Sequence, residues 1–233
     1  MSLKYFERIV NNLEFNFVPI FSFRDNSILG YRIIKDFSKL GFNDKEYMYQ
    51  LAYDMGIFEN FTLQLLKKAY THSIEKNFSN NYLFYTLRLN YIKDIKSFFH
   101  SIDKIVDELN LDKDKEKIVF DIKGIDNWSE FHNKYSNIFS YNIILRESRT
   151  TKLNINSIIN SQALFIEPRS IDTLVFIKAS ASINAPFIFN LKKEKELLLS
   201  QIKALGIDSD IQDDKVKISE WGNPAEHTSV TVH

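Results

Sequence analysis

The sequence predicts an α/β protein: a modified TIM-type (β/α) barrel with one antiparallel strand from an N-terminal hairpin, in one domain over residues 1–233. Short apolar segments alternate with helical segments along the chain, which is typical of parallel strands joined by crossover helices. About seven or eight such strands in a chain of this length favour a closed barrel over an open sheet. The Asp25-Asn26-Ser27 turn between the first two strands is too short for a crossover, so we expect this pair to be antiparallel. No linker, repeat or low-complexity segment divides the chain.

The individual strands and helices follow from the spacing of apolar side chains. A helix is expected over Leu3–Leu13, followed by apolar strands over Phe15–Phe23 and Ile28–Ile34. Helical spacing continues from Asp44 to Asn77, with a break near Gly56. The later expected strands are Tyr82–Leu89, Ile118–Ile122, Asn142–Leu145, Ala163–Ile166, Phe187–Asn190 and Asp213–Ile218. The later expected helices are Tyr91–Leu109, Ser129–Tyr135, Ile171–Ala181 and Lys193–Leu205.

Composition excludes several classes of function. The 30 basic and 30 acidic side chains cancel, so no overall field favours nucleic acid or an anionic membrane. The absence of cysteine excludes disulfides, thiol catalysis and cysteine-bound zinc, and no two of the five histidines have metal-ligand spacing. No apolar stretch approaches the roughly 18 residues needed to span a bilayer, and no signal-peptide layout is present. We therefore expect a cytoplasmic globular protein without cofactor, nucleic acid or membrane contact.

Aromatic side chains are in excess, with 20 Phe, 11 Tyr and 2 Trp. Tyr47, Tyr49, Tyr53, Phe58 and Phe61 fall on a predicted pair of helices that cannot bury all of them. One interpretation is an aromatic-rich core with partly covered tyrosines. The other is a protein-binding face, because exposed aromatic patches mark interfaces.

Several segments match the motifs of one known family in order and spacing. They are Phe17-Val18-Pro19-Ile20, Gly30-Tyr31-Arg32-Ile33-Ile34, Met48–Ile57, Ile118–Ile122, Glu194–Gly206 and Trp221-Gly222-Asn223-Pro224. Together they resemble the EAL domain, the barrel of cyclic di-GMP phosphodiesterases, over nearly the whole chain. The resemblance implies the same barrel and a place in bacterial cyclic di-GMP signalling.

The resemblance also indicates where the family's metal ligands would stand. EAL enzymes use carboxylates and one Asn at strand ends to hold two divalent metals, which activate a water for phosphodiester attack. In this chain the Glu of the Glu-Ala-Leu motif is replaced by Arg32, the metal-binding Asn by Arg88, and the next Glu by Asp121. A guanidinium cannot ligate Mg²⁺ or Mn²⁺, and it adds positive charge where the metals would sit. The resemblance therefore implies that the metal site is lost.

Other family positions differ as well. The Asp-Asp loop is absent where Leu145–Ser148 stands, the family's lysine falls at Phe165, and one Glu falls at Leu191, whereas a later Glu matches Glu194. The positions that contact the nucleotide carry Val18, Asp36, Gln50 and Tyr53 in place of the family's residues. We therefore do not expect cyclic di-GMP to bind in the family's manner.

Five residues are candidates for a degenerate pocket: Arg32, Arg88, Asp121, Glu147 and Glu194. One interpretation is that the arginines replace the positive charge of the metals. Asp121 is then expected to form a charge-assisted pair with Arg32 or Arg88 across the barrel mouth. The alternative is that strand alternation turns one or more of these arginines outward, as ordinary surface charges.

The functional expectation is a catalytically inactive EAL-like domain, not an enzyme, that acts through contacts with a protein partner or a second copy of itself. The alternatives are a cyclic di-GMP phosphodiesterase and a receptor that binds cyclic di-GMP without hydrolysing it. Arg32 and Arg88 distinguish them, because the enzyme requires both side chains to lie away from the pocket.

Overall fold

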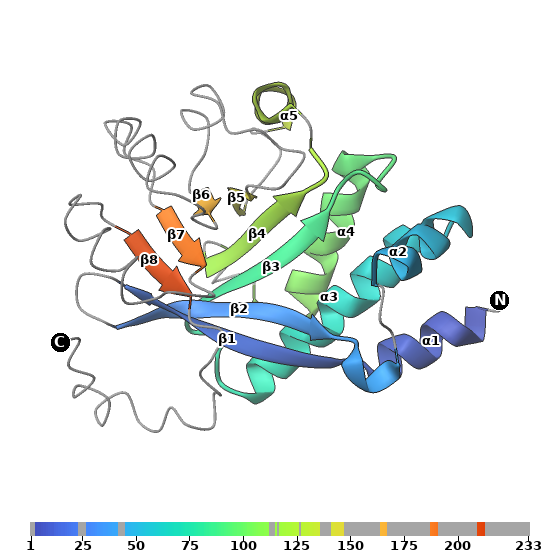
Figure 1. Cartoon of the computed structure of the whole chain (residues 1–233), viewed down its shortest axis with the longest axis horizontal. Helices are drawn as coiled ribbons and strands as arrows, with labels where there is room; N and C mark the ends of the chain where they lie inside the picture. Colours follow the sequence, from blue (N-terminus) through green and yellow to red (C-terminus); the bar gives the residue numbers. More distant parts are fainter. Residues whose placement is uncertain are drawn as a thin grey trace.

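The computed structural model of the chain describes residues 3–22, 27–41, 45–111, 115, 117–125, 127–135, 141–146, 164–166, 187–190 and 209–212. Within these residues, eight strands form a closed barrel in chain order, from β1 to β8 (Figure 1). β1 (Glu14–Ser22) runs antiparallel to both of its neighbours, β2 (Ile28–Asp36) and β8 (Ser209–Gln212), whereas every other pair is parallel. The expected barrel with one antiparallel strand is confirmed. The remaining strands are β3 (Tyr82–Arg88), β4 (Ile118–Lys123), β5 (Asn142–Arg146), β6 (Leu164–Ile166) and β7 (Phe187–Asn190).

The helices lie outside the barrel, with α2, α3 and α4 along the side of β2 to β4 (Figure 1). Gly56 adopts a φ of 70° between α2 and α3, so the expected break occurs where glycine has no steric penalty. α4 begins four residues later than expected, because the Asp94 side chain caps it by accepting a hydrogen bond from the Ser97 backbone N–H at 3.1 Å. The described helices are α1 (Leu3–Asn12), the 3-10 helix η1 (Ser38–Leu40), α2 (Lys45–Asp54), α3 (Phe58–Glu75), α4 (Ile95–Glu108) and α5 (Trp128–Tyr135).

Three expected elements, the helices Ile171–Ala181 and Lys193–Leu205 and the strand Asp213–Ile218, lie outside the described residues. The last described strand, β8, comes just before Asp213. No helix in the described part of the chain is long and apolar enough to cross a membrane.

Two apolar clusters show which face of β1 to β4 points inward. The larger cluster joins outward-facing strand residues such as Tyr85 and Phe120 to the helices, including Leu66 of α3. The smaller cluster contains Ile20, Phe84 and Val119 and lies inside the barrel. Because strand side chains alternate, residues two or four positions from Phe84 or Val119 also face inward.

Candidate functional site

The carboxyl ends of β2, β3 and β4 meet at one end of the barrel, the end at which TIM-type barrels carry their functional groups. Strand register places Thr86 opposite Asp121, and Arg88 opposite Lys123 one step nearer the mouth. Arg32 lies opposite Phe84, one step deeper than Thr86. Each step is about 6–7 Å, since it covers two residues of a strand. Arg32, Asp121 and Arg88 therefore occupy three successive levels of the barrel.

Asp121 is a buried carboxylate on the middle level. It is 2% exposed, and its Oδ2 accepts a hydrogen bond from the Thr86 hydroxyl at 2.8 Å. Among the described residues, it is the only carboxylate that is buried to this extent. Thr86 is its direct neighbour in the register, which brings the hydroxyl within reach of the carboxylate.

Arg88 turns away from Asp121 toward α2. Its guanidinium forms an ion pair with Glu46 and lies over the ring of Tyr49, with the guanidinium carbon 4.7 Å from the ring centroid. Burial raises the pKa of the Tyr49 hydroxyl well above its usual value, so the ring beneath the cation is neutral. The expected pair between Arg88 and Asp121 is therefore wrong. Arg88 sits one level nearer the mouth, where its long side chain reaches a carboxylate and an aromatic face on α2.

Arg32 lies on the inner face of β2. Its register partners are Val18 on β1 and Phe84 on β3, beside the small interior cluster. The alternative of an outward-facing surface charge is therefore wrong for Arg32, and its pair with Asp121 stays a prediction. The candidates Glu147 and Glu194 lie outside the described residues.

Lys35 was not identified from the sequence. It is partly buried on the outer face of β2, with Nζ 4.1 Å from the centroid of the Tyr85 ring and 3.4 Å from the Thr86 carbonyl oxygen. Burial first, and then the nearby charges of Arg88, Lys45 and Lys123, lower the pKa of Lys35 to about 7, whereas the Asp121 carboxylate opposes the shift. Its signal in the sequence is a lysine at the outward position after Tyr31 and Ile33, which are both buried.

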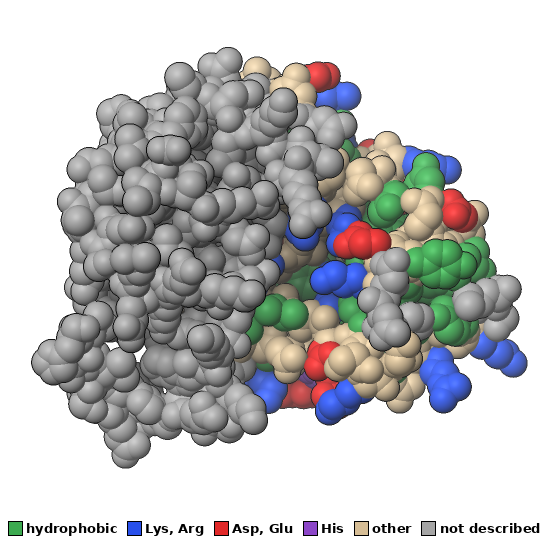
Figure 2. Space-filling model, viewed as in Figure 1, with side chains coloured by type: hydrophobic (Ala, Val, Ile, Leu, Met, Phe, Trp, Pro, Cys, Tyr) green, Lys and Arg blue, Asp and Glu red, His purple; other side chains and the backbone are tan. Residues whose placement is uncertain are grey.

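We call Lys35, Lys45, Arg88 and Lys123 the cation cluster, because the last three lie within electrostatic range of Lys35. Figure 2 shows Lys and Arg side chains gathered near the carboxyl ends of the strands. Within the described residues, no group of three His, Cys, Asp or Glu side chains is placed to hold a metal ion. Lysine and arginine are donors only, so this arrangement suits an oxyanion rather than a divalent cation.

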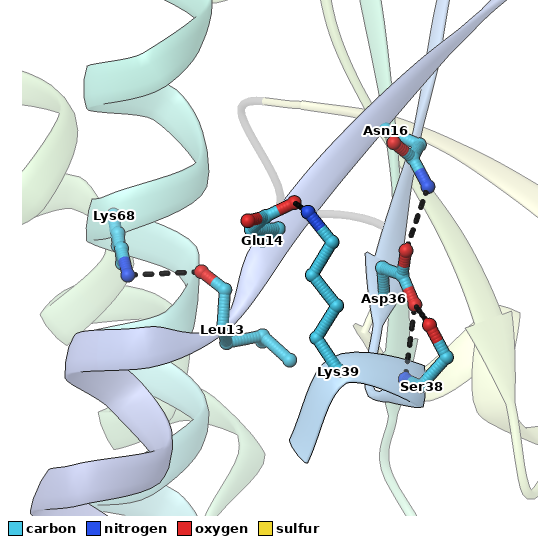
Figure 3. A network of polar contacts seen from close by, with 7 residues as sticks. All are labelled: Leu13, Glu14, Asn16, Asp36, Ser38, Lys39 and Lys68. Atoms are coloured by element: carbon cyan, nitrogen blue, oxygen red, sulfur yellow. Dashed lines mark hydrogen bonds and ion pairs between the residues drawn. The ribbon is translucent and has the colours of Figure 1, made fainter. Parts of the chain in front are cut away.

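A second polar network joins the start of β1 to the end of β2 (Figure 3). Asp36 accepts hydrogen bonds from the Ser38 backbone N–H at 3.0 Å, from the Ser38 hydroxyl at 2.5 Å and from Asn16 at 3.3 Å. The Ser38 bonds hold the pKa of the Asp36 carboxyl below its usual value. Lys39 pairs with Glu14 at 2.6 Å. Asp36, which replaces a nucleotide-contacting residue of the EAL family, is thus engaged in closing the turn into η1.

The aromatic residues of α2 and α3 divide between core and surface. Tyr49, Phe58 and Phe61 are buried, whereas Tyr47 is 66% exposed and Tyr53 is 38% exposed. This division matches the interpretation of an aromatic core with partly covered tyrosines, and the protein-binding face stays a prediction.

Tyr91, in the segment before α4, contacts the exposed part of α2. The Tyr53 ring lies 5.1 Å from the Tyr91 ring, and the Tyr91 hydroxyl donates to Gln50 Oε1 at 3.1 Å. Gln50 in turn donates to Asp54 at 2.8 Å. We call Tyr47, Gln50, Tyr53, Asp54 and Tyr91 the α2 tyrosine surface.

Neither a protein-family model nor a curated protein matches the sequence, but solved structures match the fold. The Bacillus subtilis YkuI protein, which has an EAL domain and is in complex with substrate c-di-GMP and calcium, superimposes with a TM-score of 0.65 at 14% identity. That match covers 91% of this chain and 56% of the other. The fold is that of an EAL domain.

Two further solved structures match this chain over nearly their whole length. The Xanthomonas citri FimX EAL domain in complex with c-diGMP gives a TM-score of 0.63 at 11% identity, over 91% of this chain and 92% of that one. The PaMucR phosphodiesterase in its c-di-GMP complex gives a TM-score of 0.65 at 12% identity, and the match covers 91% of this chain and 94% of that one. The present chain thus spans little more than half of the Bacillus protein but nearly all of these two.

Proposed function

We propose that this protein is a catalytically inactive EAL-like domain that acts in bacterial signalling through protein–protein contacts. The observation that carries the proposal is the charge at the carboxyl ends of β2 to β4. There the described side chains form the cation cluster, with Asp121 as the buried carboxylate. A two-metal phosphodiesterase needs the reverse: several carboxylates facing one another.

The position of Arg32 also favours the inactive domain over the phosphodiesterase. The enzyme requires both arginines to lie away from the pocket. Arg88 meets this condition, because it turns toward Glu46 on α2. Arg32 does not, because its register places it on the inner face of the barrel, next to Phe84.

The α2 tyrosine surface supports the protein-contact part of the proposal. It presents Tyr47 and Tyr53, which with Tyr82 are the large apolar side chains most exposed among the described residues. Tyrosines supply large contact areas at a low cost in side-chain entropy, and they are enriched at interfaces. The hydrogen bonds from Tyr91 to Gln50 and from Gln50 to Asp54 hold this surface in one arrangement.

Site-specific photo-crosslinking in the native bacterium tests this contact. We expect a photoreactive phenylalanine analogue in place of Tyr53 to form a discrete crosslinked product, with a protein partner or a second copy of this chain. The matched control places the same analogue at Lys104, an exposed residue of α4. The double change with Tyr47→Ser should reduce the Tyr53 product at least about fivefold, because interface tyrosines contribute on the order of 1–2 kcal/mol each. Equal labelling at both positions would contradict the proposal.

A non-hydrolysing cyclic di-GMP receptor is the second candidate, and the cation cluster is the observation that favours it, since guanidinium and ammonium groups bind phosphates. The FimX EAL domain of Xanthomonas citri is solved with c-diGMP bound. Calorimetric titration with cyclic di-GMP separates the candidates. Saturable heat that is independent of Mn²⁺ supports the receptor, whereas no heat at millimolar nucleotide supports the protein-contact domain.

A further inference from the structure

A cavity of about 570 Å³ opens outside the barrel, between α1, the start of β1 and η1. Its α1 wall consists of Tyr5, Arg8, Ile9 and Asn12, which follow the spacing i, i+3, i+4 and i+7 and therefore share one face of the helix. Ile9 is buried, Tyr5 is half-buried, and the two polar side chains are exposed, so this wall offers both apolar and polar groups. A cavity of this size falls within the range that small organic ligands fill.

The second wall of the cavity is the turn that follows β2. Lys39 and Leu40 of η1 line it, together with Glu14 of β1. The Lys39 ammonium reaches from η1 to the Glu14 carboxylate, with Nζ 2.6 Å from Oε2 (Figure 3). The Asp36 carboxylate fixes the start of η1, because it accepts hydrogen bonds from the backbone N–H and the hydroxyl of Ser38. Contacts within the chain therefore hold this wall in place.

A lysine of α3 fixes the other wall at the carboxyl end of α1. The Lys68 ammonium donates hydrogen bonds to the carbonyl oxygens of Val10, Asn11 and Leu13, at 2.8, 2.7 and 2.9 Å. Figure 3 shows the bond to Leu13, at the point where α1 passes into β1. Because both walls are fixed, a ligand meets a cavity that is already formed, which lowers the entropic cost of binding.

Arg8 carries the unbalanced charge of this cavity. It makes no ion pair within the described residues, whereas Lys39 is paired with Glu14. Burial, and then the nearby Tyr47 hydroxyl, raise the pKa of Tyr5, so this ring is a neutral part of the wall. A guanidinium binds a carboxylate through two parallel hydrogen bonds, and an aromatic wall favours a flat apolar group. One unbalanced positive charge matches a carboxylate better than a phosphate ester, which carries nearly two negative charges.

We propose that this cavity binds a small aromatic carboxylate, with the carboxylate at Arg8 and the ring against Tyr5, Ile9 and Leu40. The site is separate from the barrel mouth, because none of the candidate residues of the degenerate pocket lines the cavity. The inference does not depend on the proposed protein contacts, and its failure would leave them standing.

The probe for this proposal is 2-naphthoate, which joins one carboxylate to a flat ring system. Its dissociation constant for the whole protein is measured at pH 7.5 by the broadening of its proton NMR signals. We expect saturable binding that Arg8→Gln weakens at least about tenfold, because the charge-assisted hydrogen bonds are lost. Lys104→Gln removes an exposed cation of α4 and is the matched control, with an unchanged dissociation constant. No saturable binding to the wild-type protein, or equal affinity for Arg8→Gln, would overturn the proposal.

Two comparisons test the role of the charge. The uncharged 2-naphthamide keeps the ring, so Arg8→Gln should change its affinity less than about twofold, and an equal loss for both compounds would overturn the assignment of the carboxylate to Arg8. Glu14→Gln removes the negative charge beside Lys39, so it should strengthen 2-naphthoate binding about threefold. A Glu14→Gln protein that binds 2-naphthoate no more tightly than the wild type would place the probe outside this cavity and overturn the proposal. Tighter binding of 2-naphthyl phosphate than of 2-naphthoate would overturn the choice of a carboxylate.

Discussion

Replacing Asp121 with alanine should lower the free energy of unfolding by about 2–4 kcal/mol at pH 7. Asp121 is 2% exposed, and its carboxylate accepts a hydrogen bond from the Thr86 hydroxyl at 2.8 Å. Its negative charge also opposes the effect of the nearby cations on Lys35. The change leaves the partly buried Thr86 hydroxyl without this acceptor and removes the negative charge that opposes the cations around Lys35. Urea denaturation, followed by circular dichroism, measures the loss.

Two variants resolve the causes of that loss. Asp121→Asn keeps an acceptor for Thr86 and removes only the charge, so we expect a smaller loss that shrinks when Lys35 is also replaced by methionine. Glu108→Ala removes an exposed carboxylate that pairs with Lys67 at 2.5 Å, and it should cost under about 1 kcal/mol. If Asp121→Ala costs no more than Glu108→Ala, the buried carboxylate does not stabilise the barrel mouth.

Lys35→Met should raise the free energy of unfolding at pH 6 by on the order of 1–2 kcal/mol, with little change at pH 10. The folded pKa of Lys35 is about 7, below the value of about 10.4 in an unfolded chain. Below pH 7 the amine is charged in both states and carries its full burial penalty. Between pH 7 and pH 10 the unfolded state binds the extra proton, so the wild-type protein gains stability as the pH rises and the two proteins converge.

The comparison is made by urea denaturation at pH 6, 8 and 10. Lys96→Met is the matched control, because it removes an exposed lysine and should show no such dependence on pH. If Lys35→Met is destabilised equally at all three pH values, the Lys35 side chain makes favourable contacts in the folded protein, and its burial carries no penalty for the charged amine.

Most of the described fold could be predicted because it depends on local patterns. The hairpin follows from two apolar strands that a short polar segment separates in the sequence, and the break at Gly56 follows from a residue that accepts positive φ. Errors of a few residues occurred where a side chain decides the boundary. At α4, the Asp94 cap sets the start at Ile95, although apolar spacing extends back to Tyr91.

The site could be predicted in part. Asp121 and Arg32 were identified by their positions in a motif, but their different depths depend on strand register, which the sequence does not specify. The partner of Arg88 is Glu46, 42 positions away, and that contact exists only after α2 packs against β3. Lys35 was missed because a charge after an apolar strand normally faces solvent, whereas here helices cover the outer face of the sheet.

Turnover of cyclic di-GMP decides most directly whether this barrel is catalytically inactive. The protein is incubated with cyclic di-GMP and either Mg²⁺ or Mn²⁺, and the linear product is followed by chromatography, with the PaMucR phosphodiesterase as the active control. We predict no product above the protein-free background with either metal, because Arg32 faces into the barrel and Asp121 is the only carboxylate buried to this extent among the described residues. Linear product that forms with metal and disappears on addition of EDTA would contradict this prediction.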